Sequence, residues 1–314
     1  MRIAITGEGN LAMSLMGPLL ESRHEVVALV QNGRKVKRAG RVLRAAWGRL
    51  LGPLAGVTGL AKRNGIPIVW IDRMTEQELA PLRATNPDVL LVGGFSIILK
   101  KPILEAPRIG CVNMHSSLLP KHRGPNPFSA VIIAGEEESG ITFHQIDEGI
   151  DTGPILEQYS FPLRPQDTAI DVHQRACALA ALHVAEVMDN IERKGMYGRP
   201  QDPGGMYDKR LQKPDSYIDW SRPAREIERK VRGMRPFFIG RFRYGRYTVM
   251  TTRVRCEDLK TSDAPPGTIL KTSPFVQVVA GTGVVTLLTA YATAPIPWTW
   301  PAPWNKIKAG DRVT

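Results

Sequence analysis

The sequence predicts an α/β protein in two parts, a Rossmann-like N-terminal domain and a small β-barrel-like C-terminal domain of the OB type. Strand-like apolar runs alternate with helix-like stretches as far as residue 161. A stretch at 195–216 is rich in glycine and proline and poor in large hydrophobic residues. Short strand-like runs separated by glycine fill the C-terminal third. We therefore expect domains at 1–205 and 206–314.

The N-terminal elements follow from the hydrophobic pattern. Short runs dense in Val, Ile and Leu predict strands at 2–6, 26–30, 66–70, 89–92, 110–115, 141–146 and 155–161. Helix-like stretches lie between them, and they are expected at 9–22, 59–64, 75–85 and, as a long closing helix, 167–194. Asn86-Pro87 ends the third of these helices, because the residue before a proline avoids the helical conformation.

The C-terminal elements are shorter. A helix is predicted at 223–233, followed by strand-like runs at 240–251, 267–271, 276–280 and 284–288. The tail 295–304 reads PIPWTWPAPW, and its prolines exclude a regular helix or a central strand.

Composition excludes several classes of protein. Hydrophobic residues make up 43% and charged residues 23%, which is typical of globular proteins rather than disordered ones. The longest nearly uncharged apolar stretch, 89–99, is far shorter than the roughly 18–20 residues that a membrane span needs. The three cysteines, Cys111, Cys177 and Cys256, form no CxxC pair, so neither a disulfide framework nor a structural zinc site is expected. We expect a cytoplasmic protein that uses no metal.

The net charge of +12 is concentrated in two places. The segment 34–49 holds seven basic residues and no acidic one, and 207–314 holds 19 basic against 9 acidic residues. This asymmetry favours a polyanionic partner. A solvated basic surface without a partner is the alternative.

Gly7-Glu8-Gly9-Asn10-Leu11-Ala12 fits the G-x-G-x-x-A fingerprint of dinucleotide binding. However, the second predicted strand ends in Gln31 and Asn32, where an acid should bind the ribose. We therefore interpret the glycines as residues of a tight turn.

Three polar residues predict a catalytic site. Asn113 and His115 are two residues apart at the end of a predicted strand, so they share one face. Asp151 stands in an acidic, glycine-rich loop after the strand 141–146 and can reach His115 if the strands are neighbours. An amide donor for an oxyanion, a proton carrier and an orienting acid fit acyl transfer. The other histidines, His122 and His144 among them, have no ligand spacing and are expected at the surface or in the core; His122 and Arg123 stand beside the predicted site.

The motifs around these residues resemble a known family. The segment 113–120 reads NMHSSLLP, Arg123-Gly124 follows, and 147–153 reads DEGIDTG. Together they resemble the 10-formyltetrahydrofolate-dependent formyltransferases over most of 1–205, and more weakly at 213–220. The resemblance implies that Asn113, His115 and Asp151 are catalytic and that 10-formyltetrahydrofolate is the formyl donor, with no metal. It further implies that the folate is bordered by Ser117, Leu118, Leu119, Pro120, Gly93 and Phe95.

The resemblance also suggests an amine acceptor. Methionyl-tRNA formyltransferases in this family hold tRNA with a basic insertion and a basic C-terminal domain, the two places where this sequence concentrates its charge. An aminoacyl-tRNA is therefore the expected acceptor, bound by Arg34, Lys35, Lys37, Arg38 and Arg41. A small-molecule amine, such as an amino sugar nucleotide or hydroxyornithine, is the alternative. A non-catalytic folate- or RNA-binding protein is disfavoured by the intact Asn113, His115 and Asp151.

Overall fold

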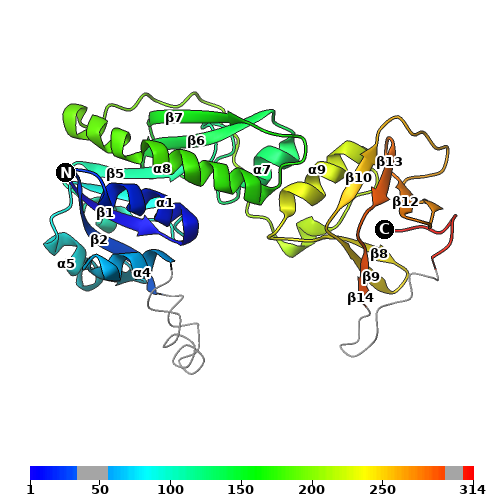
Figure 1. Cartoon of the computed structure of the whole chain (residues 1–314), viewed down its shortest axis with the longest axis horizontal. Coiled ribbons are helices and arrows are strands. Elements are labelled where there is room, and N and C mark those ends of the chain that lie inside the picture. The colour runs from blue at the N-terminus through cyan, green and yellow to red at the C-terminus, as the bar shows by residue number, and fades with distance from the viewer. Residues whose placement is uncertain (34–55, 294–306) are drawn as a thin grey trace, which may run out of the picture. The chain divides into compact units, whose positions relative to one another are not determined.

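The computed structural model describes residues 1–33, 56–293 and 307–314, which cluster into two compact units (Figure 1). Unit 1 consists of residues 1–124, 140–161 and 174–207, and unit 2 of residues 125–139, 162–173 and 208–314, in each case as far as they are described. The basic segment 34–49 and the tail 295–304 lie outside the described residues. The domain boundary between residues 205 and 206 stays a prediction.

A seven-stranded sheet with the order β3-β2-β1-β4-β5-β6-β7 forms the centre of unit 1. Its strands are β1 (Arg2–Gly7), β2 (Glu25–Asn32), β3 (Ile68–Ile71), β4 (Val89–Gly93), β5 (Gly110–His115), β6 (Glu138–Gln145) and β7 (Ile155–Pro162). Neighbours from β3 to β5 run parallel, whereas β6 runs antiparallel to β5. The predicted α/β core with a parallel sheet is thereby confirmed.

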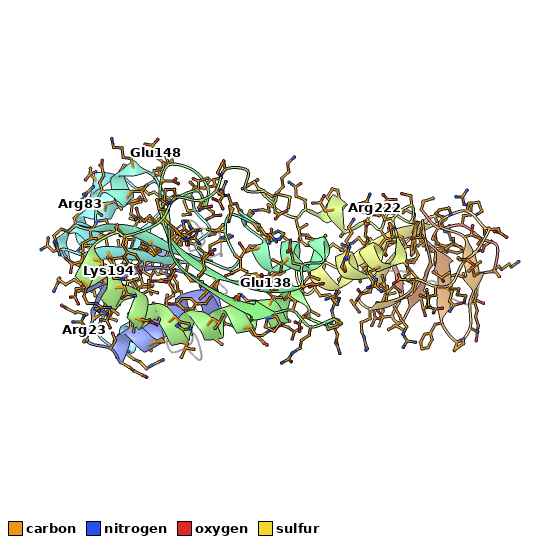
Figure 2. All side chains as sticks on the ribbon, turned by 90° about the horizontal axis from the view of Figure 1, so that it is seen from above. Arg23, Arg83, Glu138, Glu148, Lys194 and Arg222 are labelled. Atoms are coloured by element: carbon orange, nitrogen blue, oxygen red, sulfur yellow. The ribbon has the colours of Figure 1, made fainter. Side chains whose placement is uncertain are left out.

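The helices between successive strands from β1 to β5 are α1 (Gly9–Leu20), α4 (Gly56–Arg63), α5 (Glu76–Ala84) and α6 (Lys101–Leu104). Helix α5 begins with a capping box, in which the Thr75 hydroxyl accepts from the Glu78 amide and the Glu78 carboxylate accepts from the Thr75 amide. Helix α8 (Ala169–Lys194) ends near Arg23, which lies in the turn after α1 (Figure 2). Arg23 forms an ion pair with Asp189 of α8.

Close packing explains Gly7, the last residue of β1. A Cβ on Gly7 would lie 2.0 Å from the carbonyl oxygen of Gly93 in the neighbouring strand β4. The side chain of Gln31 then donates to the Gly7 carbonyl at 2.7 Å. Gly7 of β1 thus lies against the ends of β4 and β2. This close packing agrees with our interpretation of Gly7 as a residue of a tight turn.

Unit 2 is rich in antiparallel strands, as predicted. One sheet has the order β10-β13-β12-β11 and the other β14-β9-β8, and every pairing within them is antiparallel. The strands are β8 (Gly240–Tyr244), β9 (Tyr247–Thr251), β10 (Val254–Glu257), β11 (Ile269–Lys271), β12 (Val276–Val279), β13 (Val284–Leu287) and β14 (Tyr291–Thr293). Trp220 packs edge-on against Phe242 in the core between these elements, with ring centres 5.3 Å apart. The arrangement is consistent with the expected small barrel.

Two helices and a short turn complete unit 2. They are α7 (Pro127–Ala134), α9 (Ala224–Met234) and the 3₁₀ turn Lys213–Ser216. Helices α7 and α9 pack together closely, because Gly233 leaves room for α7: a Cβ there would lie 3.0 Å from Ile133 and 3.1 Å from Ile132. The sequence did not predict α7.

Candidate active site

The predicted catalytic residues meet at the carboxyl end of β5. Asn113 and His115 alternate with Met114 along this strand, and the antiparallel partner β6 places His144 directly opposite Asn113. Asp151 comes from the loop between β6 and β7, in a left-handed conformation with φ +54°. All four side chains belong to unit 1.

Short contacts connect these side chains. The Asn113 Nδ2 group donates to Asp151 Oδ1 at 3.2 Å and lies 3.1 Å from His144 Nε2. The other carboxylate oxygen of Asp151 accepts the Gly124 amide at 2.9 Å and lies 3.6 Å from His115 Nδ1. The site is therefore ordered by hydrogen bonds between the protein's own groups.

The hydrogen bonds assign the protons on both imidazoles. His115 Nε2 faces the carbonyl oxygen of His122 at 2.8 Å, so this nitrogen carries the proton and Nδ1 is the free acceptor in the neutral ring. His144 Nδ1 faces the carbonyl oxygen of Gln145 at 2.7 Å, so its Nε2 accepts from Asn113. His115 Nδ1 is consequently a base positioned beside a carboxylate.

Burial and neighbouring groups set the charges. Burial lowers the pKa of His115 below its ordinary value, and the Asp151 carboxylate opposes that effect. Burial raises the pKa of the Asp151 carboxyl, but His144, His115 and the hydrogen bond from the Gly124 amide outweigh that effect and lower the pKa to about 2. At neutral pH the site therefore holds a carboxylate and a neutral His115, which can take up a proton.

The loop after β5 is fixed by the strands beside it. The Ser117 hydroxyl donates to the Lys121 carbonyl at 2.7 Å, and the Leu119 amide donates to the Thr142 hydroxyl at 3.1 Å. Gln158 on β7 donates to the Leu119 carbonyl at 2.7 Å. Ser117 and Leu119 are buried, while Leu118 and Pro120 are partly exposed and offer the accessible side chains of this loop.

Gly93 and Phe95 lie at the end of β4, the neighbour of β5. A Cβ on Gly93 would lie 2.5 Å from Leu15 Cδ1 of α1, so Leu15 would have to shift to make room for any side chain here. Phe95 is partly buried against the apolar cluster that includes Leu79 and Ile103. That these two residues border a folate stays a prediction.

Sequence reasoning missed three groups that contact Asp151: His144, the Gly124 amide and Gln201. Gln201 donates to the carbonyl oxygens of Asp151 and Gly153 at 2.9 and 2.7 Å. No sequence motif marks His144, because its position opposite Asn113 depends on the register of β6 against β5. The predicted acceptor-binding residues Arg34, Lys35, Lys37, Arg38 and Arg41 lie outside the described residues.

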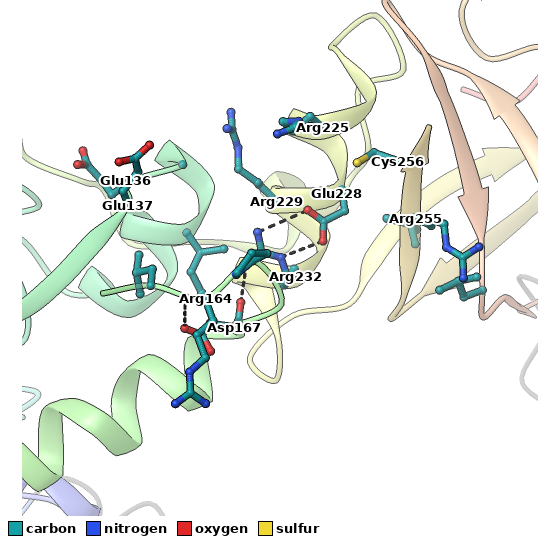
Figure 3. A pocket seen from close by; sticks show the side chains of 16 residues that line it. Glu136, Glu137, Arg164, Asp167, Arg225, Glu228, Arg229, Arg232, Arg255 and Cys256 are labelled. Carbon is teal, nitrogen blue, oxygen red and sulfur yellow. Dashed lines mark hydrogen bonds and ion pairs between the residues drawn. The ribbon is translucent and has the colours of Figure 1, made fainter. Parts of the chain in front are cut away.

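Unit 2 contains a basic cavity of about 710 Å³ (Figure 3). Five arginines and four acidic residues line it: Arg164, Arg225, Arg229, Arg232, Arg255, Glu136, Glu137, Asp167 and Glu228. Arg232 pairs with Glu228 at 2.8 Å, and Arg225 pairs with Asp258 at 2.6 Å. Arg229 extends away from the Arg232–Glu228 pair (Figure 3), its Nε is buried without a hydrogen bond, and no ion pair to it is found within the described residues.

Within the described residues, one cluster of side chains has the composition of a metal site. It consists of His24, Asp189 and Glu192, whose possible ligand atoms lie within 4.8 Å of one another. Arg23 binds both carboxylates, and the Met1 ammonium binds Glu192 at 2.9 Å. These cations already balance the charge, so the group is an ion-pair network. No helix in the described parts of the chain is long and apolar enough to cross a membrane.

Comparison with known proteins identifies the family to which this chain belongs. The formyl transferase family matches residues 1–187, and the C-terminal domain of formyl transferases matches residues 210–302. The chain belongs to the formyl transferase family. All of Asn113, His115, His144 and Asp151 fall within the part matched by the first of these families.

Relatives of this formyl transferase share its length. A methionyl-tRNA formyltransferase of Parvibaculum lavamentivorans is 32% identical over 91% of this chain and 90% of its own. A methionyl-tRNA formyltransferase of Pseudomonas putida is 33% identical over 89% of this chain and 87% of its own.

Solved structures of similar fold include sugar-modifying enzymes. An N-formyltransferase of Helicobacter canadensis, in complex with folinic acid and dTDP-3-aminofucose, is 20% identical and has a TM-score of 0.67 over 91% of this chain and 98% of its own. WlaRD, a sugar 3N-formyl transferase, is 19% identical and has a TM-score of 0.68 over 91% of this chain and 97% of its own.

Proposed function

We propose that this protein transfers the formyl group of 10-formyltetrahydrofolate to the amino group of an aminoacyl-tRNA, with methionyl-tRNA as the first choice. The observation that carries the proposal is the contact between Asn113, His115 and Asp151 in a member of the formyl transferase family. Formyl transfer to an amine requires an amide, an imidazole nitrogen with a free lone pair and a carboxylate.

In the proposed reaction the acceptor amine attacks the formyl carbon. A C–N bond forms, and the carbonyl electron pair moves to the oxygen. The Asn113 Nδ2 group turns one N–H from its present acceptor to this oxyanion. His115 Nδ1 takes the proton that the amine loses, since the carboxyl of Asp151, with a pKa of about 2, is the weaker base.

The same proton completes the reaction. Asp151 stabilises the imidazolium across the 3.6 Å between its carboxylate and Nδ1. As the bond between the formyl carbon and the folate nitrogen breaks, the imidazolium returns the proton to that nitrogen. The products are a formamide and tetrahydrofolate, and the protein ends in its starting state.

The donor is inferred from related proteins and from the loop after β5. Folinic acid and tetrahydrofolic acid are bound in solved structures of similar fold. We propose that the folate lies along Ser117, Leu118, Leu119 and Pro120 and reaches Gly93 and Phe95. Leu118 and Pro120 offer partly exposed apolar surface for its ring.

Two observations support a tRNA acceptor. Relatives at 32–33% identity over about nine tenths of the chain are methionyl-tRNA formyltransferases. The basic residues of 34–49 and 207–314 could neutralise phosphates. We propose that Arg34, Lys35, Lys37, Arg38 and Arg41 contribute to this contact.

A formyl-transfer assay tests the function. Purified protein with 10-formyltetrahydrofolate should formylate methionyl-tRNA, and the apparent KM should rise steeply with salt. Replacing Arg34, Lys35, Lys37 and Arg38 with alanine should raise the KM for tRNA and reduce the salt slope, while the KM for folate stays unchanged. Equal salt slopes for both proteins would remove this segment from the tRNA contact.

A small amine is the second candidate acceptor, because solved structures of similar fold are titled as sugar N-formyltransferases. The same assay with a dTDP-amino sugar in place of tRNA separates the two. Turnover with the sugar nucleotide and none with methionyl-tRNA would reverse our choice, and turnover with neither would refute both.

A further inference from the structure

The segment 199–207 crosses the active-site loops of unit 1, and we call it the strap. Arg199 at its start exchanges two backbone hydrogen bonds with Ile155, at 2.7 and 2.8 Å. At its end the Met206 carbonyl accepts the Arg123 amide at 3.0 Å, and Tyr207 forms a β-bridge with Arg123. Gly205 lies so close to Arg123 and Pro120 that a Cβ there would meet both at 2.6 Å. The strap is thus fixed at both ends and seated on the loop that carries Arg123.

Gln201 is the residue of the strap that reaches the catalytic loop. Its Nε2 group donates to the carbonyl oxygens of Asp151 and Gly153, which uses both of its protons. Its Oε1 atom accepts from Arg123 Nε at 3.1 Å and from Arg123 Nη2 at 2.7 Å. Since a guanidinium can only donate, Arg123 fixes the orientation of the Gln201 amide.

Gln201 of the strap binds the backbone of Asp151, and the Gly124 amide binds the Asp151 side chain. The Gly124 amide binds Asp151 Oδ2 at 2.9 Å, and Arg123 is the residue before Gly124. Asp151 itself has a left-handed backbone, which is unfavourable for a residue with a side chain unless its surroundings impose it. Two bonds from Gln201 to the carbonyls of residues 151 and 153 impose that conformation.

We propose that Gln201 and Arg123 are positioning residues for the reaction, acting through Asp151. Gln201 fixes the backbone from which the Asp151 carboxylate reaches Asn113, Gly124 and His115, and Arg123 fixes Gln201. The expected loss of turnover rests on the proposed function. The fixing of the Asp151 backbone by Gln201 and Arg123 does not depend on that function.

Loss of Gln201 should affect turnover more than binding. Gln201→Ala should lower kcat by at least about 10-fold, because small displacements of a catalytic group cost one to two orders of magnitude in rate. The KM for folate should change by less than about threefold, since the hydrogen bonds of Gln201 go to Arg123, Asp151 and Gly153. Arg123→Ala should have a similar effect, and Arg123→Lys should recover part of the activity because it retains one charged donor.

A double variant separates positioning from general loss of structure. Gln201→Ala should cost less than about twofold when added to Asp151→Asn, measured in single turnover with enzyme in excess, because residues that act as one unit are not additive. If Gln201→Ala costs the same factor in both backgrounds, Gln201 does not act through Asp151 and the inference fails.

Asp202→Ala is the matched control. Asp202 follows Gln201 in the strap, and its side chain is exposed. We expect kcat within about threefold of the parent protein. A loss as large as that of Gln201→Ala would mean that any disturbance of the strap suffices, and would overturn the assignment to Gln201.

An NMR titration tests the inference without activity. In the parent protein the carboxyl of Asp151 should titrate near its pKa of about 2. In Gln201→Ala the pKa should rise, because a loosened carboxylate loses contact with His144, His115 and the Gly124 amide. An unchanged pKa would overturn the inference. A parent protein that shows this shift but transfers no formyl group would refute the proposed function alone.

Discussion

The active site of unit 1 and the arginine-lined cavity of unit 2 differ in how completely their polar and charged groups are paired. In the active site, each oxygen of Asp151 accepts a hydrogen bond, and both protons of the Asn113 amide are directed at acceptors. In the cavity, Arg232 and Arg225 are paired, but no ion pair to Arg229 is found among the residues described. Transfer of a small group requires side chains that are held in fixed positions. Binding of a polyanion requires positive charges that are not already neutralised by acidic side chains.

The largest effect should come from the active site. Replacing Asn113, His115 or Asp151 singly with alanine should lower formyl transfer by at least about 10²-fold, the usual cost of losing an oxyanion donor or a proton carrier. Steady-state kinetics on protein with a native circular dichroism spectrum provide the measurement. Glu148→Gln is the control, because Glu148 is exposed in the same loop as Asp151 (Figure 2), and near-parental turnover is expected there. Near-parental turnover in any alanine variant would remove that residue from the site.

A smaller effect should come from the cavity of unit 2. If Arg229 meets a tRNA phosphate, Arg229→Ala should raise the KM for tRNA several-fold and reduce the slope of log KM against log salt by about one. The kcat and the KM for folate should stay at the parental values. Lys271→Ala, an exposed cation on β11 of the same unit, provides the comparison. An identical slope for the parent and Arg229→Ala would mean that the free guanidinium has no phosphate partner.

The smallest effect concerns stability against pH. Burial lowers the pKa of His115 in the folded protein, so the unfolded chain binds this proton first and stability falls as the pH drops below about 6.5. His115→Asn should reduce that fall, by at most about 1.4 kcal/mol per pH unit. Urea unfolding between pH 5 and pH 7.5 measures the slope. A slope in His115→Asn equal to the parental slope would contradict a buried neutral imidazole.

Much of the fold was predictable because its signals are local. The strands of the parallel sheet are dense in Val, Ile and Leu, and their order of appearance with helices between them predicts the α/β core. Asn113, His115 and Asp151 were predictable as candidates because a strand period places the first two on one face and a short motif marks the third. Their contact distances were not, because these depend on how β6 pairs with β5.

The residues that were missed share a physical cause. His144 reaches the site through antiparallel register, which no single segment encodes. Gln201 stands in the stretch rich in glycine and proline that predicted a linker, and its importance comes from two carbonyl groups about fifty residues earlier in the chain. Helix α7 was missed because prolines at 125 and 127 suggest a loop, although Pro127 is well suited to the first turn of a helix.

The packing of α7 on α9 has a consequence for how the chain is made. Residues 127–134 are synthesised long before residues 224–234, yet their apolar side chains Val131 and Ile132 belong to the same unit as α9. While the ribosome extends the chain, α7 is therefore complete before α9, the helix whose Gly233 lies against Ile132 and Ile133, has been synthesised. A nascent chain halted near residue 205 therefore still lacks α9, one of the helices against which α7 packs.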